Sequence, residues 1–311
     1  MAFEEQQPFD PASFEHIPVL LNECLTGLAI DPAGTYLDGT AGGAGHSRQI
    51  ALRLDAAKGG RLISLDQDPD AVQTARARLA GLPATVVQIN FRYAGQALEQ
   101  LGIEKINGAL LDLGVSSHQL DDAARGFSYR ADAPLDMRMS QQGETAADLV
   151  NTESREELAR ILRDYGEEPY AWQIAGKIVE ARETAPILTT LQLADIVASA
   201  MPPAERRKNK NPSRRTFQAL RIAVNHELDA LEEGLDTIFD HGLRIRRRPP
   251  QSVQHGCCVC FRRYILNNKA AHIARSAMCA ASHKQAGGDV GESKKIEASN
   301  LDASIGPSGE T

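Results

Sequence analysis

The feature that most constrains the fold is a repeated pattern of short apolar runs, each followed by a segment with helical spacing. The four runs read TYLD, RLISL, TVVQI and GALLDL, at residues 35–38, 61–65, 85–89 and 108–113. Continuous apolar runs of this length are typical of parallel strands that are buried on both faces. Helices are expected between them, at 46–54, 71–79 and 97–101. Because crossovers between parallel strands are right-handed, we predict a doubly wound, Rossmann-like α/β sheet.

After residue 118 the pattern changes. Residues 119–142 are charged and irregular, and the segments after them have helical spacing without strand-like alternation. Helices are expected at 146–150, 154–165, 170–184, 190–199 and 215–233. We therefore predict a helical insertion in the sheet domain. The expected division is 1–118 for the first part of the α/β domain, 119–222 for the inserted helical domain and 223–311 for the return to the α/β domain.

Composition limits the class of protein. Of the 311 residues, 42% are hydrophobic and 24% are charged, which is typical of a globular chain with a sizeable core. No run reaches the roughly 20 apolar residues that a membrane helix needs, and the acidic start MAFEEQQPFD does not resemble a signal peptide. We expect a cytoplasmic protein without membrane contact. The net charge of −7 argues against a generic nucleic-acid coat.

A glycine-rich loop, residues 39–45, joins the first predicted strand to the first helix. Asp66 follows 21 residues after Gly45, at the tip of the second strand, where an acid commonly binds a ribose diol. The alternative is an ordinary cap or a solvated carboxylate. Arg48 occupies the third glycine position of a dinucleotide fingerprint, so S-adenosylmethionine, which has no pyrophosphate, is favoured over a nicotinamide cofactor. Asp38 could bind the methionine ammonium or order the loop.

Asp112 ends the fourth predicted strand, at the edge where open α/β sheets bind ligands. The alternative is an acid that caps the next turn. Several short motifs accompany it: HIPVLL at 16–21, the loop 39–46, LLDLGVSSHQLD at 110–121, RGFS at 125–128, PLDMRM at 134–139, YGEE at 165–168 and RTFQALRI at 215–222. Together, from about residue 16 to 240, they resemble the RsmH/MraW family of bacterial 16S rRNA cytosine-N4 methyltransferases.

The resemblance implies a class I methyltransferase fold, S-adenosylmethionine as cofactor, and methylation of a cytosine N4 in the decoding centre of the small ribosomal subunit. It also implies that the cofactor is contacted at seven positions, Ala44, Gly45, His46, Asp66, Phe91, Asp112 and Gln119. For Phe91, core packing is the alternative.

The chemistry assigns a further role to the end of the fourth strand. The N4 amine of cytosine is a poor nucleophile, so the enzyme has to align it with the methyl group and accept a proton. We hypothesise that Asp112, as catalytic residue, or a backbone carbonyl within 113–117 holds this amine. The target base has to leave its stack to reach the pocket. No metal is needed for this reaction, and no metal site is expected.

Residues 205–215 hold six basic residues and one acid, just before a predicted helix. Such a run can bind phosphates, although it could also be a solvated loop. The residues expected to bind RNA are Arg206, Arg207, Lys208, Lys210, Arg214 and Arg215. The expected partner is 16S rRNA or the small subunit, and a homodimer is left open.

The sequence departs from the family after Asp240. The family continues with a Gly-Gly-Arg-Leu turn and a further strand, whereas this chain reads HGLRIRRRPP at 241–250. A shifted reading frame would explain the difference, because codons for Arg-Arg-Pro-Pro, read one base later, can encode Gly-Gly-Arg-Leu. We expect 241–311 to be divergent and partly disordered, with the late strands absent or replaced. The cysteines at 257, 258 and 260 do not have the spacing of a structural zinc site.

Two other functions remain open at this point. The chain could be a relative that binds cofactor or RNA without turnover, because its C-terminal part is altered. It could also be a nicotinamide oxidoreductase, although the missing third glycine argues against that class.

Overall fold

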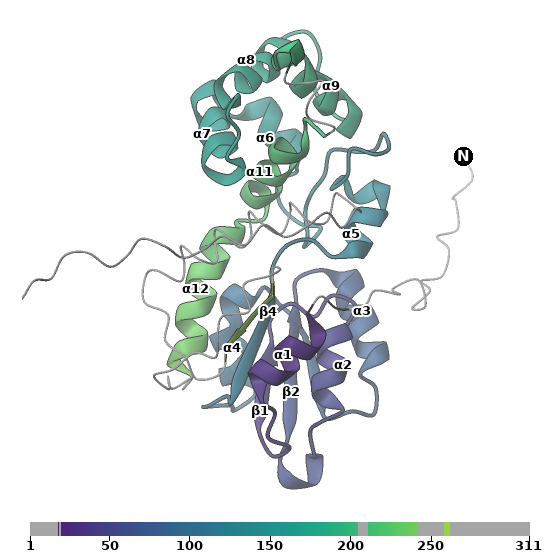
Figure 1. Ribbon diagram of the computed structural model, residues 1–311, viewed down its shortest axis with the longest axis vertical. Coiled ribbons are helices and arrows are strands. Elements are labelled where there is room, and N and C mark those ends of the chain that lie inside the picture. Colours follow the sequence, from purple (N-terminus) through teal and green to yellow (C-terminus); the bar gives the residue numbers. More distant parts are fainter. Residues whose placement is uncertain (1–17, 19, 205–210, 242–257, 262–311) are drawn as a thin grey trace, which may run out of the picture.

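The computed structural model of the chain describes residues 18, 20–204, 211–241 and 258–261 (Figure 1). Its sheet has the order β3-β2-β1-β4-β5. Strands β1 (Thr35–Asp38), β2 (Arg61–Asp66), β3 (Ala84–Gln88) and β4 (Gly108–Asp112) are parallel. The predicted doubly wound sheet is confirmed, and each of its four strands lies within one residue of the predicted bounds.

The edge strand β5 (Cys258–Phe261) pairs antiparallel to β4, with Asp112 opposite Cys258. It lies within residues 241–311, where we expected the late strands of the family's sheet to be absent or replaced. A strand therefore does lie beside β4, although it is only four residues long. Residues 242–257 and 262–311 lie outside the described part of the chain.

Helices cover both faces of the sheet because successive strand residues point to opposite sides. Tyr36 and Leu110 pack with α1 (Leu21–Leu28), α2 (Gly45–Ala51) and α3 (Pro69–Arg78). Leu37 and Leu111 pack on the other face with α4 (Ala94–Gln100) and α12 (Glu227–Asp240). Helix α1 is an element that the sequence analysis did not predict.

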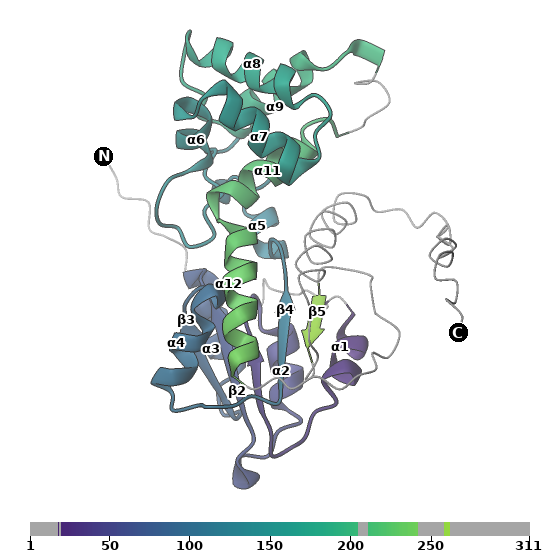
Figure 2. The same cartoon turned by 90° about the vertical axis from the view of Figure 1, so that its left-hand side faces the viewer.

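A second group of helices has its own hydrophobic core at the end of the molecule away from the sheet (Figures 1 and 2). It consists of α6 (Ala146–Thr152), α7 (Arg155–Gly166), α8 (Ala171–Arg182), α9 (Thr190–Ala200) and α11 (Arg214–Val224). These helices were expected in this region. A short helix, α5 (Ser117–Asp121), lies between the two parts of the molecule.

The single helix predicted at 215–233 is wrong, because the structure has two helices there. Helix α11 ends at Val224, His226 adopts a left-handed conformation with φ 48°, and α12 starts at Glu227. Asn225 fixes the break, since its amide donates to the Met137 carbonyl at 2.7 Å and accepts from the Met139 N–H at 2.7 Å. A buried ion pair between Arg221 and Glu227, with Nε and Oε1 2.6 Å apart, joins the two helices.

Among the described residues, no helix combines the length and the apolar character that crossing a bilayer requires.

Candidate active site

The carboxyl ends of the parallel strands bring the predicted site residues to one edge of the sheet. The glycine-rich loop follows β1, Asp66 ends β2, Phe91 follows β3, and Asp112 ends β4. This edge faces α5 and the helical part of the molecule (Figure 1). Open α/β sheets bind ligands at this edge, so the topology supports a site here.

The glycine-rich loop is held by a buried acid. Asp38 is 0% exposed, accepts hydrogen bonds from Ser47 Oγ at 2.6 Å and from the Thr40 N–H at 3.1 Å, and therefore orders the loop. Burial raises the pKa of Asp38, while its hydrogen bond from Ser47 acts in the opposite direction. Of the two roles considered for Asp38, the contacts favour loop ordering.

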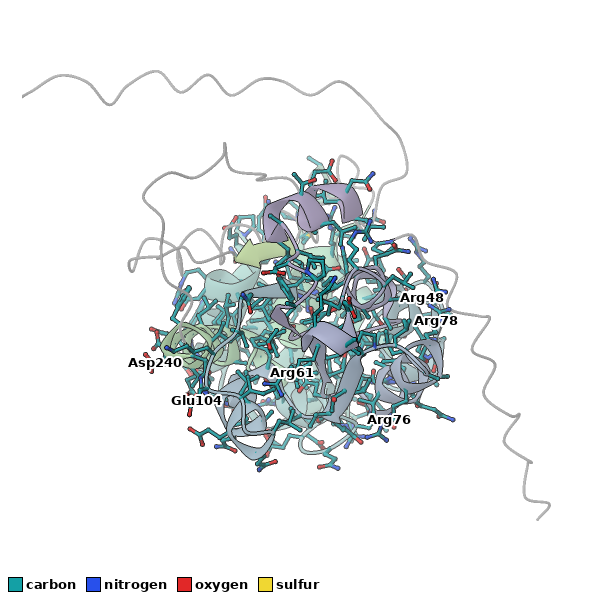
Figure 3. The ribbon with its side chains drawn as sticks, turned by 90° about the horizontal axis from the view of Figure 1, so that it is seen from below. Arg48, Arg61, Arg76, Arg78, Glu104 and Asp240 are labelled. Atoms are coloured by element: carbon teal, nitrogen blue, oxygen red, sulfur yellow. The ribbon has the colours of Figure 1, made fainter. Side chains whose placement is uncertain are left out.

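The end of the loop is conformationally strained. Ala44, directly before α2, has φ 60°, in the left-handed region that side chains other than glycine avoid. Arg78 from α3 donates a hydrogen bond to the Gly43 carbonyl at 2.7 Å and so fixes the position of the loop relative to α3. Arg48 is exposed on the same flank of the molecule (Figure 3). Strained loops of this kind occur frequently at ligand sites.

Asp66 has a carboxylate whose two oxygens are oriented by the backbone. Oδ2 accepts from the Gly42 N–H at 2.7 Å, and Oδ1 accepts from the Asp68 N–H at 2.9 Å. Burial raises the pKa of Asp66 to about 6, against the lowering effect of these two hydrogen bonds. The side chain remains partly exposed, so it is available to a ligand at the strand tip.

Asp112 lies beside the loop. Its backbone N–H donates to Thr40 Oγ1 at 2.6 Å, and its Oδ2 lies 3.8 Å from His46 Nδ1. Burial raises the pKa of Asp112 to about 6, and the nearby His46 lowers it. The side chain is 32% exposed, so a carboxylate with a near-neutral pKa faces the edge of the sheet.

His46 is buried against Asp112. Burial by itself lowers the pKa of this imidazole, but a hydrogen bond with Cys24 and the carboxylates of Asp38 and Asp112 outweigh burial and raise it. Cys24 comes from α1 and is 4% exposed. The imidazole is thus placed to stabilise negative charge on Asp112.

Phe91 is wedged between the sheet and α12. A Cβ on Gly234 would lie 2.7 Å from Phe91 Cδ2, so glycine is required for this close approach. The ring is partly buried in the core cluster of that face. Most of the contacts of the Phe91 side chain are therefore core packing, and only its exposed part is available to contact an adenine.

The Gln119 amide makes two hydrogen bonds within the protein. Its Oε1 accepts from the Ser116 N–H at 3.0 Å, and its Nε2 donates to Asp68 Oδ2 at 2.7 Å, with the residue 5% exposed. The structure therefore places this predicted cofactor contact in a link between the loops after β2 and β4.

Asp68 is the centre of that link. It caps α3, which begins with Pro69. It also accepts from Arg125 Nη1 at 2.9 Å, and the Arg125 guanidinium donates through Nη2 to the carbonyls of Arg138 at 3.0 Å and Met139 at 3.1 Å. Arg125 therefore ties the irregular segment before α6 to the loop that holds Asp66.

Only two of the predicted RNA-binding residues are described. Arg206, Arg207, Lys208 and Lys210 lie outside the described residues. Arg214 and Arg215 begin α11 and are partly exposed. Burial lowers the pKa of Arg214, and Arg215 lies near the buried carboxyl of Glu168. The first turn of α11, in the helical part of the molecule, thus carries two cationic side chains.

Three residues that shape the site were not predicted from the sequence: Thr40, Cys24 and Arg125. Thr40 lies within the glycine-rich loop, and Arg125 starts one of the motifs that carry the resemblance. Cys24 had no sequence signal. Within the described part of the chain, no group of three His, Cys, Asp or Glu residues could hold a metal ion.

Comparison with known proteins gives consistent matches. Residues 13–245 match the model of the MraW methylase family, and this match ends close to the point where the sequence departs. A ribosomal RNA small subunit methyltransferase H from Lachnospira eligens is 51% identical over 230 residues, covering 73% of this chain and 72% of the relative. Proteins of the same name from Heliobacterium modesticaldum and Geotalea daltonii are 54% identical over 231 residues and 48% identical over 276 residues. The first comparison covers 73% of each chain, and the second covers 80% of this chain and 88% of the relative.

Proposed function

The chain belongs to the MraW methylase family, and from that premise we propose that it transfers a methyl group from S-adenosylmethionine to the N4 amine of a cytosine in the decoding centre of 16S rRNA. The fold is that of a class I methyltransferase. The observation that carries the proposal is the pair of carboxylates at the tips of β2 and β4, Asp66 and Asp112, on either side of a strained glycine-rich loop.

The residues at this edge fit the cofactor. Asp66 would accept hydrogen bonds from the ribose diol, while Ala44, Gly45 and His46 would line the methionine side. Space is available above the loop, since a Cβ built on Gly42 would meet nothing within 4 Å. Phe91 would pack on the adenine with its exposed part, and Gln119 would act through Asp68. When bound, S-adenosylmethionine supplies an electrophilic methyl group.

Asp112 is the proposed catalytic residue. Its carboxylate would accept a hydrogen bond from the cytosine N4 amine, which localises the nitrogen lone pair, and would then take the proton that the methylated amine loses. His46, 3.8 Å from Oδ2, would stabilise the ionised carboxylate before the reaction. A backbone carbonyl within residues 113–117 remains an alternative acceptor for the same amine.

This role predicts a pH dependence. Because burial raises the pKa of Asp112 to about 6, the carboxylate that accepts the proton is present above pH 6 and is lost below it. We expect kcat/KM for the small subunit to be flat above about pH 7 and to fall about tenfold per pH unit well below 6. A pH–rate profile with no acid limb near 6 would contradict this assignment. Asp66, whose pKa is also about 6, should affect the KM for the cofactor instead.

Contact with RNA phosphates predicts a salt dependence. We propose that Arg206, Arg207, Lys208, Lys210, Arg214 and Arg215 bind the rRNA backbone, supported by the partly exposed cationic start of α11. Replacing three of these basic residues, at 206–208, by glutamine should reduce the slope of log K against log salt by roughly two to three units. Glutamine at Arg163, an exposed arginine of α7, is the matched control. If the slope is the same in both variants, the basic run at 206–208 does not bind RNA phosphates.

Other features of the proposal follow from the same premise. We propose the division into an α/β domain, an inserted helical domain at 119–222 and a return after 223, supported by separate hydrophobic clusters. We propose a cytoplasmic location, because the proposed substrate belongs to the ribosomal small subunit. The proposed chemistry requires only one copy of the chain, so it does not decide between a monomer and a homodimer.

Calorimetry tests the cofactor site directly. S-adenosylmethionine is expected to bind the folded chain, and Asp66→Asn should weaken its binding at least about tenfold, because a hydrogen bond to a charged group is lost. Failure of the folded wild-type chain to take up the cofactor would contradict the proposal. Uptake without methyl transfer to small subunits would instead favour the alternative function, a relative that binds without turnover.

A further inference from the structure

The chain has one tryptophan, Trp172, and it is 48% exposed. It lies in the first turn of α8, at the end of the molecule farthest from the sheet (Figure 2). A large aromatic ring that remains this exposed has given up much of the free energy that burial would provide. The ring lies outside the cofactor site and outside the basic run at 205–215.

Arg155, the first residue of α7, covers one side of this ring. Its Cζ lies 4.2 Å from the ring centroid, and its Nη2 makes a long hydrogen bond of 3.4 Å to the Trp172 carbonyl. A Cβ on Gly176, one turn later in α8, would lie 2.8 Å from Nη2. Glycine at 176 therefore allows the guanidinium to lie flat across α8.

One N–H donor of the guanidinium makes no hydrogen bond within the described part of the chain. Arg155 Nε is buried and has no hydrogen-bond partner among the described residues. A buried N–H without an acceptor is costly, and such groups in folded proteins call for an explanation such as a ligand. The stacking on Trp172 holds this donor in place without satisfying it.

A hollow of about 370 Å³ borders Arg155 and the α8 residues that follow Trp172. Its polar lining consists of Arg155, Gln173, Lys177, Glu180 and Ser199. Two of these side chains are cationic and one is anionic, and the anion is bound by Lys177 at 2.7 Å. In a protein with a net charge of −7, this small site thus has a local excess of positive charge.

We propose that the surface formed by Arg155, Trp172, Gln173 and Lys177, here named the α8 platform, binds one nucleotide of a single-stranded stretch of RNA. The unstacked base lies against the Trp172 ring, and the phosphate accepts from the Arg155 guanidinium and from Lys177. Stacking on an aromatic ring together with basic side chains is the usual way in which single strands are bound. This inference rests on the proposed function, since it takes the substrate to be RNA. It adds a second RNA contact, separate from the basic run.

Because Trp172 is the one tryptophan of the chain, its fluorescence reports directly on this surface. Titrating the full chain with a single-stranded RNA of about ten nucleotides should quench Trp172 fluorescence in a saturable way. The same sequence as a blunt duplex should quench it much less, because its bases are already stacked. Equal quenching by both, or by neither, would overturn the proposal.

Variants separate stacking from charge. With fluorescently labelled single-stranded RNA, Trp172→Ala and Arg155→Lys should each weaken binding about tenfold, whereas Trp172→Phe should retain most of it. Leu188→Ala is the matched control, since Leu188 is an exposed apolar residue of the same helical part, 57% exposed. Thermal unfolding midpoints close to wild type would show that the variants fold. An affinity of Trp172→Ala equal to that of Leu188→Ala would overturn the proposal.

Methylation of small subunits distinguishes this inference from the proposed function. Trp172→Ala should raise the KM for the particle about tenfold and leave kcat unchanged. If the wild-type chain methylates small subunits but Trp172→Ala has the same KM and the same RNA affinity, the platform is wrong and the function stands. If Trp172→Ala weakens binding to the particle but not to naked single-stranded RNA, the platform contacts protein and the RNA proposal is overturned. If the RNA quenches the fluorescence but no methyl transfer occurs, the platform stands and the proposed function fails.

Discussion

Replacing Asp112 by asparagine is expected to lower kcat for methyl transfer by at least about 100-fold, because general-base catalysis contributes roughly 100- to 10,000-fold. Asparagine has nearly the same shape and can still accept a hydrogen bond from the amine, but it cannot take up the proton. The cofactor affinity should therefore change far less than kcat. Single-turnover methylation of small subunits, with the cofactor Kd measured in parallel, checks both parts.

The matched control is Asp121→Asn. Asp121 is an exposed acid at the end of α5, on the segment that follows Asp112. It should keep wild-type kcat. If Asp112→Asn keeps more than about a third of the wild-type kcat while folding normally, a backbone carbonyl within 113–117 becomes the better candidate for holding the amine.

Replacing Arg125 by methionine is expected to lower the free energy of unfolding by about 3–5 kcal/mol, the usual cost of breaking a buried ion pair. The side chain of Arg125 is 9% exposed and that of Asp68 is 2% exposed, so the variant leaves a buried carboxylate without its cation. Because the Asp68 N–H orients Asp66, cofactor affinity should fall as well. Urea unfolding and cofactor titration measure the two effects.

Two controls separate charge burial from simple loss of side-chain packing. Arg163→Ala removes an exposed ion pair, with side chains 65% and 43% exposed, and should cost less than about 1 kcal/mol. Adding Asp68→Asn to Arg125→Met should recover part of the lost stability, since the unpaired charge disappears. If Arg125→Met is no more destabilised than Arg163→Ala, the Arg125–Asp68 pair does not hold the segment before α6 to the sheet.

The sheet was predictable because its signal is local. Each strand of the parallel sheet is a short apolar run, and Tyr36 and Leu37 can both be apolar only if helices cover both faces of the sheet. The break between α11 and α12 was not predictable in the same way. It depends on Asn225, whose partners Met137 and Met139 lie more than 80 residues earlier in the chain.

The same distinction holds for the site. The positions of Asp66 and Asp112 were predictable because each ends an apolar strand, and parallel strands bring their ends to one edge. The role of Arg125 depends on Asp68, 57 residues away in sequence, so no local pattern indicates it. The bonds of Gln119 to Ser116 and Asp68 could not be predicted from its sequence neighbourhood alone, since Asp68 lies 51 residues away, and its cofactor contact stays a prediction.

We propose above all that the edge formed by β1, β2 and β4 directs a methyl group to a cytosine amine. Incubation of this chain with methyl-labelled S-adenosylmethionine and small subunits from a strain that lacks the modification tests it most directly, with nucleosides identified by mass spectrometry. The account predicts label in N4-methylcytidine from 16S rRNA for the wild-type chain, and at least about 100-fold slower labelling for Asp112→Asn. Label in a different nucleoside, or none from folded protein that has bound the cofactor, would contradict it.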